Sequence, residues 1–286
     1  MTQYFVYDVF SDRPFGGNPL AVIPDATKLP DDKLQRIARE FNFSETTFVF
    51  PPDDAANTAK VRIFTPTQEI PFAGHPTIGT AIALSDIGRG GVDMVLELGV
   101  GPIPCQAEPG WAQFKTRVPL QTWGGITPEI VASSIGQSVG CVRTDRHTPI
   151  IASVGLPFAI AELQDRSALA AAETNIDAFK SFEASWPAKS HYDLFVYVRV
   201  GANIHARMFA PLDGIPEDPA TGSAAAALAA WLGRLEGASN GFIITQGEDM
   251  GRPSTINAAV EVIDGDPVAV SIAGSAVKVM EGKLKI

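Results

Sequence analysis

The chain has 286 residues, more than the roughly 100–200 typical of one domain, so two domains are expected. Hydrophobic residues make up 45% and charged residues 19%, a globular balance that excludes disorder for the bulk of the chain. The formal net charge is −10 and no run of Lys or Arg occurs, which argues against a nucleic-acid partner.

Targeting and cofactor signals are missing from the sequence. The N-terminal stretch MTQYFVYDVFSDRPFGG has neither a basic start nor a continuous apolar core, and no apolar run approaches the roughly 20 residues that cross a bilayer. Cys105 and Cys141 have no metal or redox spacing, the four histidines are scattered, and the glycine-rich phosphate motifs do not occur. We therefore expect a cytoplasmic protein without a cofactor, a metal or a membrane partner.

The first seventy residues alternate strand, turn and helix patterns. Residues 31–41 carry apolar side chains at Leu34, Ile37, Ala38 and Phe41, the spacing of an amphipathic helix. The preceding Pro30 and two aspartates suit the first turn of that helix. Strands are predicted at 3–10, 19–23, 46–50 and 60–64, and turns at 11–18 and 51–57.

An internal repeat is the most informative feature. RIFTPTQEIP at 62–71 and RMFAPLDGIP at 207–216 are offset by 207 − 62 = 145 residues, and five of ten positions are identical. Upstream, TFVF (47–50) corresponds to LFVY (194–197), and downstream each copy enters a helix of small residues. Convergent strand–loop–helix patterning is the alternative, but the agreement in order, spacing and identity favours duplication.

The repeat divides the chain into two halves. Trp123-Gly124-Gly125 resembles a linker, and the following Thr127-Pro128 resembles the cap and first position of a helix. We expect an N-terminal half at 1–119 and a C-terminal half at 120–275. Strands are expected at 268–272 and 276–280, and the sequence allows them to close either half, with 276–286 compatible with packing in the N-terminal half.

Each repeat leads a glycine-containing loop into the start of a helix. Helix starts expose unpaired N–H groups and the positive end of the dipole, which favour an anion such as a small carboxylate. The polar residues there are His75 and Thr77 in one half, and Asp218, Thr221 and Ser223 in the other. The alternatives stay open: the helices are packed core helices, Asp218 caps a helix that Pro219 begins, and His75 is structural. A helix start lowers the pKa of His75 and keeps it neutral.

Glu45 lies between the amphipathic helix and a strand. Beside Phe43 and Phe48 its carboxyl group is expected to be desolvated, which raises a carboxyl pKa toward neutrality and suits an acid/base. The ordinary alternative is a solvated turn residue.

Several motifs together resemble the PhzF family of phenazine-biosynthesis-like proteins, which share the diaminopimelate epimerase fold. They occur in the family order and cover nearly the whole chain. The resemblance implies an α+β fold with two pseudo-symmetric domains, each a curved, mostly antiparallel sheet around a central helix, with the site between them. It also implies a homodimer and no cofactor. The matching stretches are FGGNPLAV (15–22), AREFNFSETTF (38–48), IFTPTQEIPFAGHPTIGTA (63–81), EDPATGSA (217–224) and TQGEDMGRPS (245–254).

The resemblance also implies residue roles. The family's catalytic glutamate falls on Glu45, which would take a proton from one carbon and return it to another, as in the isomerisation of trans-2,3-dihydro-3-hydroxyanthranilate. Supporting catalytic residues fall on His75, Asp218 and Ser223. Substrate-binding residues are expected at Asn18, Gly74, Thr221 and Gly222.

One departure from the wider superfamily concerns cysteine. The related epimerases carry a cysteine at the start of each central helix, whereas Ala73 and Pro219 occupy those places here. A two-thiol mechanism is therefore disfavoured. Two readings compete with an isomerase of a small anionic metabolite: an epimerase with a non-thiol base, and a non-catalytic metabolite- or partner-binding protein on the same fold.

Overall fold

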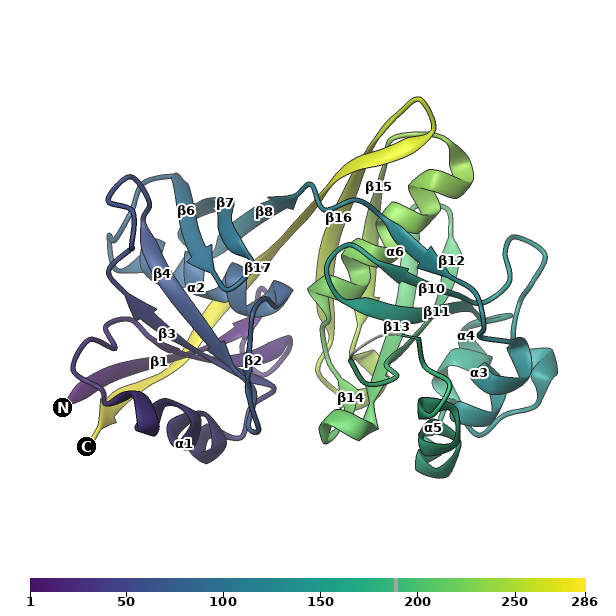
Figure 1. The fold of residues 1–286 in the computed structure, drawn as a ribbon, viewed down its shortest axis with the longest axis horizontal. Coiled ribbons are helices and arrows are strands. Elements are labelled where there is room, and N and C mark those ends of the chain that lie inside the picture. Colours follow the sequence, from purple (N-terminus) through teal and green to yellow (C-terminus); the bar gives the residue numbers. More distant parts are fainter. Residues whose placement is uncertain (188–189) are drawn as a thin grey trace. The chain divides into compact units, whose positions relative to one another are not determined.

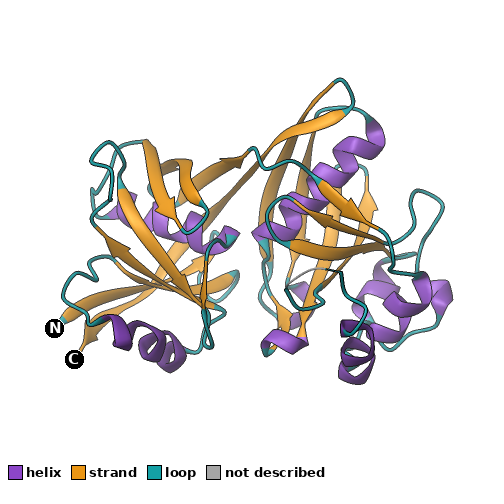
Figure 2. Ribbon diagram, in the orientation of Figure 1, coloured by secondary structure: helices purple, strands orange, loops and turns teal. Residues whose placement is uncertain are grey.

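The computed structural model describes residues 1–187 and 190–286, which form two compact units. Unit 1 comprises residues 1–116 and 271–286, and unit 2 comprises residues 117–270. Each unit is a strand-rich α+β body with a helix inside its sheet (Figures 1 and 2). The predicted fold class is thereby confirmed.

Unit 1 is a curved sheet around α2. Its strands pair in the order β1, β2, β3, β4, β6, β7 and β8, and β17 pairs with both β8 and β1. The β2–β3 and β4–β6 pairs are parallel and the others with a described register are antiparallel. The elements are β1 (Thr2–Val9), β2 (Asn18–Ile23), α1 (Asp31–Phe41), β3 (Glu45–Phe50), β4 (Ala59–Phe64), β5 (Glu69–Ile70), α2 (Gly74–Asp86), β6 (Asp93–Leu98), β7 (Gly101–Glu108), β8 (Trp111–Thr116) and β17 (Asp266–Leu284).

The two helices of unit 1 pack in different ways. Helix α1 buries Leu34, Ile37 and Ala38 against Phe48 and Phe64 of the sheet, as its amphipathic spacing predicts. Helix α2 is buried from its first residue through its eleventh, because small residues allow strands to approach it from all sides. The N-terminal end of α2 carries His75, one of the polar residues described below.

Unit 2 repeats this plan and adds helices on the outer face of its sheet. Strands β9 to β13, β15 and β16 pair in sequence, with parallel β11–β12 and β13–β15 pairs. The elements are β9 (Gln121–Trp123), α3 (Pro128–Ser134), η1 (Val139–Cys141), β10 (Ile150–Ser153), β11 (Pro157–Glu162), α4 (Arg166–Ala170), α5 (Ile176–Glu183), β12 (Leu194–Val200), β13 (Asn203–Ala210), η2 (Pro211–Asp213), β14 (Ile215–Asp218), α6 (Gly222–Glu236), β15 (Asn240–Gln246), η3 (Glu248–Met250) and β16 (Ser254–Ile263).

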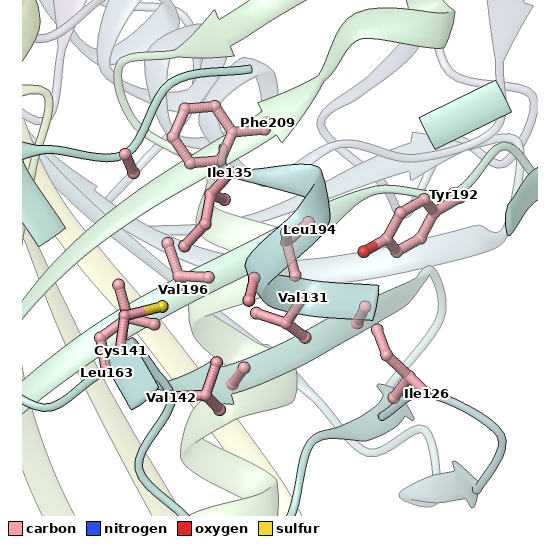
Figure 3. Close-up of a cluster of buried hydrophobic side chains, with 14 of the residues drawn as sticks. Ile126, Val131, Ile135, Cys141, Val142, Leu163, Tyr192, Leu194, Val196 and Phe209 are labelled. Atoms are coloured by element: carbon pink, nitrogen blue, oxygen red, sulfur yellow. The ribbon is translucent and has the colours of Figure 1, made fainter. Parts of the chain in front are cut away.

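The added helices cover a separate apolar core. Leu194 and Val196 of β12 belong to a cluster with Val131 of α3 (Figure 3). Phe179 of α5 belongs to the same cluster. Thr127 caps α3 and Pro128 follows it, as the sequence predicts. The residues of β12 that alternate with Leu194 and Val196 therefore point to the opposite face, toward α6.

The duplicated Arg-x-Phe motif has the same packing in both units. The guanidinium of Arg62 lies 5.1 Å from the ring centre of Phe64, and that of Arg207 lies 5.0 Å from the ring centre of Phe209. Residues two apart on a strand share a face, so this stacking explains why Arg and Phe are both retained.

The predicted strands at 268–272 and 276–280 form one long strand, β17. The part from Ala276 onward pairs with β1 in unit 1, while Asp266 at its start belongs to unit 2. A single strand thus belongs to both units.

Candidate active site

Three polar side chains converge in unit 1, namely Asn18, Glu45 and His75. Asn18 is the first residue of β2 and Glu45 is the first of β3, and since these strands are parallel neighbours both side chains lie at the same edge. His75 is the second residue of α2. Its Nδ1 lies 3.4 Å from Glu45 Oε2 and 3.4 Å from Asn18 Nδ2. Three segments far apart in sequence therefore build one polar cluster.

The turn before Asn18 is tightly constrained. Gly17 has φ +62°, and a Cβ at this position would lie 2.3 Å from the carbonyl oxygen of Val9. One turn earlier, the backbone N–H of Phe15 donates to the buried carboxylate of Asp8 at 2.7 Å. Glycine is thus required where the chain doubles back to begin β2.

His75 is only 4% exposed, and burial lowers its pKa to about 3. The imidazole is therefore neutral at physiological pH, as the sequence predicts, although desolvation is the cause. A neutral ring offers one N–H and one lone pair. Nδ1 consequently either donates to a Glu45 carboxylate or accepts from a protonated Glu45 or from the Asn18 amide.

The surroundings of Glu45 differ from the expectation. Alternation along β3 places Glu45 and Thr47 on the face of α2, where Thr80 donates to Thr47 at 2.9 Å. Phe48 points to the opposite face and packs under α1. The prediction that Phe48 flanks the Glu45 carboxyl is therefore wrong, and the imidazole of His75 lies beside this carboxyl group instead.

The second polar set lies at the start of α6 in unit 2. Helix α6 begins at Gly222 and Thr221 precedes it, so Pro219 does not begin a helix and Asp218 does not cap one. Asp218 instead ends β14, where it pairs with Met208, and its Oδ2 accepts a hydrogen bond from Thr221 Oγ1 at 2.5 Å. The N-cap alternative for Asp218 is thus excluded. Ser223 is partly exposed at the second helical position.

Gln246 is a residue of this loop that sequence reasoning missed. Its Oε1 accepts from the Thr221 N–H at 3.0 Å, and its Nε2 donates to the Asp218 carbonyl at 2.7 Å and to Thr221 Oγ1 at 3.0 Å. The side chain is 1% exposed. Gly247, with φ +75°, follows it where a Cβ would lie 2.7 Å from the Pro219 carbonyl. The TQGED stretch at 245–249 is one of the motifs that resemble the PhzF family, but the positions of its residues along the chain do not indicate a role for Gln246.

Replacing Gln246 with Leu removes all three bonds and leaves a buried amide and a buried carbonyl without them. We expect a loss of at least about 2 kcal/mol in unfolding free energy, because each of the two unsatisfied buried groups costs about 1–3 kcal/mol. Thermal unfolding followed by circular dichroism measures the change, with the exposed Gln121→Leu as the control. Equal melting temperatures for the two variants would contradict the role of Gln246.

Thiol and metal chemistry find little support among the described residues. Cys105 and Cys141 are both buried, and burial raises the pKa of the Cys105 thiol to about 12 and also that of Cys141. In residues 1–187 and 190–286 no group of three or more His, Cys, Asp or Glu is arranged to hold a metal ion. Within the same ranges no helix is long and apolar enough to cross a membrane.

Comparison with known proteins defines the class of this fold. A PhzF-family phenazine biosynthesis protein from Bacillus anthracis matches with a TM-score of 0.89 at 25% identity, covering 100% of this chain and 99% of that one. A probable proline racemase from Agrobacterium radiobacter K84 matches with a TM-score of 0.69 at 13% identity, covering 100% and 93%. The fold is therefore that of the diaminopimelate epimerase-like proteins.

Residues 7–282 match the family model PhzC-PhzF, described as phenazine biosynthesis-like protein. The chain is 35% identical to trans-2,3-dihydro-3-hydroxyanthranilate isomerase from Pseudomonas aeruginosa over 99% of both chains. The protein belongs to the phenazine biosynthesis-like family and is an isomerase.

Proposed function

We propose that this isomerase moves a proton between two carbons of a small carboxylate-bearing metabolite, similar to trans-2,3-dihydro-3-hydroxyanthranilate, with Glu45 as the acid/base. The observation that carries the proposal is the contact of the Glu45 carboxyl with a buried neutral imidazole, at 3.4 Å. The name of the Pseudomonas aeruginosa relative supports the substrate class.

The steps balance without a redox partner. The Glu45 carboxylate takes a proton from one carbon of an allylic system, the double bond shifts, and the carboxylic acid returns the proton to the far carbon. His75 supports the second stage without changing tautomer, since the Nδ1 lone pair accepts a hydrogen bond from the Glu45 carboxylic acid that proton uptake forms. Asn18 holds the imidazole in place through its amide.

In unit 2, Asp218, Thr221, Gly222 and Ser223 are proposed to bind polar groups of the substrate. Gly74 and Gly222 open the two buried helices, whose first N–H groups suit a carboxylate. One substrate held by both units, the homodimer and a cytoplasmic location stay predictions.

The test is turnover of trans-2,3-dihydro-3-hydroxyanthranilate in deuterium oxide, followed by NMR. We expect isomerised product, with deuterium only at the carbon that receives the proton, to the extent that Glu45 exchanges with solvent. Absence of turnover would overturn the substrate class. Inversion at a stereocentre with no shift of the double bond would instead identify an epimerase.

A further inference from the structure

Strand register identifies a residue of unit 2 that corresponds to Glu45. The repeated arginines of β4 and β13 pair with Phe48 of β3 and Val196 of β12, respectively. The sequence match of TFVF (47–50) with LFVY (194–197), which aligns Phe48 with Phe195, is therefore off by one residue, and strand register aligns Phe48 with Val196. Counting three residues back from each gives Glu45 in unit 1 and Asp193 in unit 2. Both residues therefore stand at the start of equivalent strands.

A second alignment gives the same correspondence. Residues 17–22 read GNPLAV and residues 155–160 read GLPFAI, with Gly, Pro and Ala at matching places. Leu20 in the first segment lies opposite Glu45. In the second, Ala159 lies opposite Leu194, so its matching residue Phe158 lies beside Asp193. The parallel strand pairs and the antiparallel strand pairs thus independently match Asp193 with Glu45.

Asp193 points to the face of its sheet that α6 covers. It shares that face with Tyr197, four residues along, whose hydroxyl is 2.7 Å from His147 Nε2. The His147 ring in turn meets Trp231 of α6 edge to face, with ring centres 5.8 Å apart. The side chains of Asp193 and Tyr197 therefore face the helix.

Helix α6 also begins at the end of β12 where Asp193 lies. Trp231 follows Ser223 by eight residues, about 12 Å of helix, and Tyr197 follows Asp193 by four residues, about 13 Å of strand. Strand pairing sets the direction, because Phe195 lies opposite Met208 and Met208 lies opposite Asp218, four residues before α6 begins. Ser223 and Asp193 therefore lie at the same end of α6 and β12. The pair corresponds to His75 and Glu45 in unit 1.

One oxygen of the Asp193 carboxyl group is left without a partner among the described residues. Its Oδ1 is buried and makes no hydrogen bond within 1–187 or 190–286. Among residues 1–187 and 190–286, the charged groups that raise its pKa are Asp213 from η2, Glu183 from α5 and Asp218 from β14. His191 is bonded to Glu183 at 2.7 Å and lies 3.9 Å from Asp213, so it offsets part of that charge.

We infer that Asp193 is a substrate-binding residue, a carboxyl group that donates a hydrogen bond to an oxygen of the substrate at the start of α6. The inference rests on the proposed function. Burial and the three neighbouring carboxylates raise the pKa of Asp193 well above its usual value, which favours the protonated form of the carboxyl group. A protonated carboxyl donates to a hydroxyl or carboxylate oxygen, whereas an ionised one would repel an anionic substrate.

The experiment compares Asp193→Ala and Asp193→Asn in steady-state turnover of trans-2,3-dihydro-3-hydroxyanthranilate. We expect KM to rise about tenfold or more in Asp193→Ala, with kcat changed less than threefold, because one hydrogen bond to the bound substrate is lost. Asp193→Asn recovers most of this loss, since an amide N–H also donates. Asp177→Asn, an exposed aspartate of the same unit, is the control.

The pH dependence separates binding from a structural role. KM of the wild type is expected to rise with pH as Asp193 loses its proton, and this rise is absent in Asp193→Asn. A raised carboxyl pKa means that the native state holds the proton longer than the unfolded state, so wild-type stability falls as pH rises above the usual aspartate range. Relative to the wild type, Asp193→Asn therefore gains stability toward neutral pH, which thermal unfolding measures.

Outcomes distinguish the two proposals. Wild-type turnover together with an unchanged KM in Asp193→Ala would overturn the role of Asp193 and leave the proposed function intact. Absence of turnover, together with no binding of 3-hydroxyanthranilate by calorimetry, would overturn the proposed function and with it the role of Asp193. If Asp193→Ala does not fold, Asp193→Asn decides the question. A KM of folded Asp193→Asn that rises with pH as it does in the wild type would also contradict the role of Asp193.

Discussion

Glu45→Gln is expected to lower kcat by about 10²–10⁴-fold while KM changes little. The amide has nearly the same shape as the carboxyl group and still hydrogen-bonds to its neighbours, but it takes up no proton from carbon. General acid–base catalysis contributes an acceleration of this size. Steady-state kinetics with trans-2,3-dihydro-3-hydroxyanthranilate measures both constants, and thermal unfolding checks that the variant is folded.

Glu40→Gln provides the matched control for this experiment. Glu40 is an exposed carboxylate in the last turn of α1, five residues from Glu45, so the same chemical change there should leave kcat within twofold of the wild type. If Glu45→Gln keeps more than a tenth of the wild-type kcat, Glu45 is not the group that moves the proton.

Local patterns in the sequence predicted most of the elements that build the first polar cluster. The apolar spacing of 31–41 predicted the observed bounds of α1, and the small residues after Ala73 and after Glu217 predicted the two buried helices. These features depend on near neighbours in the chain. Long-range pairing does not leave such a signal, and for that reason the joining of 268–272 and 276–280 into one strand was not foreseen.

In the candidate site, too, local motifs were predictable from the sequence and long-range contacts were not. Glu45 and His75 came from motifs, but their 3.4 Å contact depends on the parallel β2–β3 pairing and the position of α2. The role of Gln246 depends on β15 lying next to the loop before α6, which no spacing along the chain encodes. Asp218 was misplaced in one reading because Asp-Pro is typical of a helix start, whereas pairing with Met208 keeps Asp218 extended.

The internal repeat places an arginine at equivalent positions of the two units, Arg207 and Arg62, so a substitution of one can be compared with the same substitution of the other. Arg207→Met is expected to lower the unfolding free energy by about 3–5 kcal/mol, the cost of removing one partner from a buried ion pair. The Arg207 guanidinium is 10% exposed and bonds to both oxygens of Glu217, at 2.8 and 2.7 Å. It also donates to the carbonyls at the end of α4, which belong to Leu169, Ala170 and Ala172.

Arg62→Met makes the same change at the equivalent position of unit 1 and is expected to cost about 1 kcal/mol or less. Arg62 pairs with Glu69 and Asp31, which are 43% and 80% exposed, and solvent screens such pairs. Urea denaturation of both variants, followed by circular dichroism, measures the difference. Equal losses would show that burial does not set the strength of these pairs. A larger loss of unfolding free energy for Arg207→Met would mean that the two copies of the motif have different roles. The copy in unit 1 stacks Arg62 on Phe64 at the surface, whereas the copy in unit 2 holds the end of α4 through Arg207.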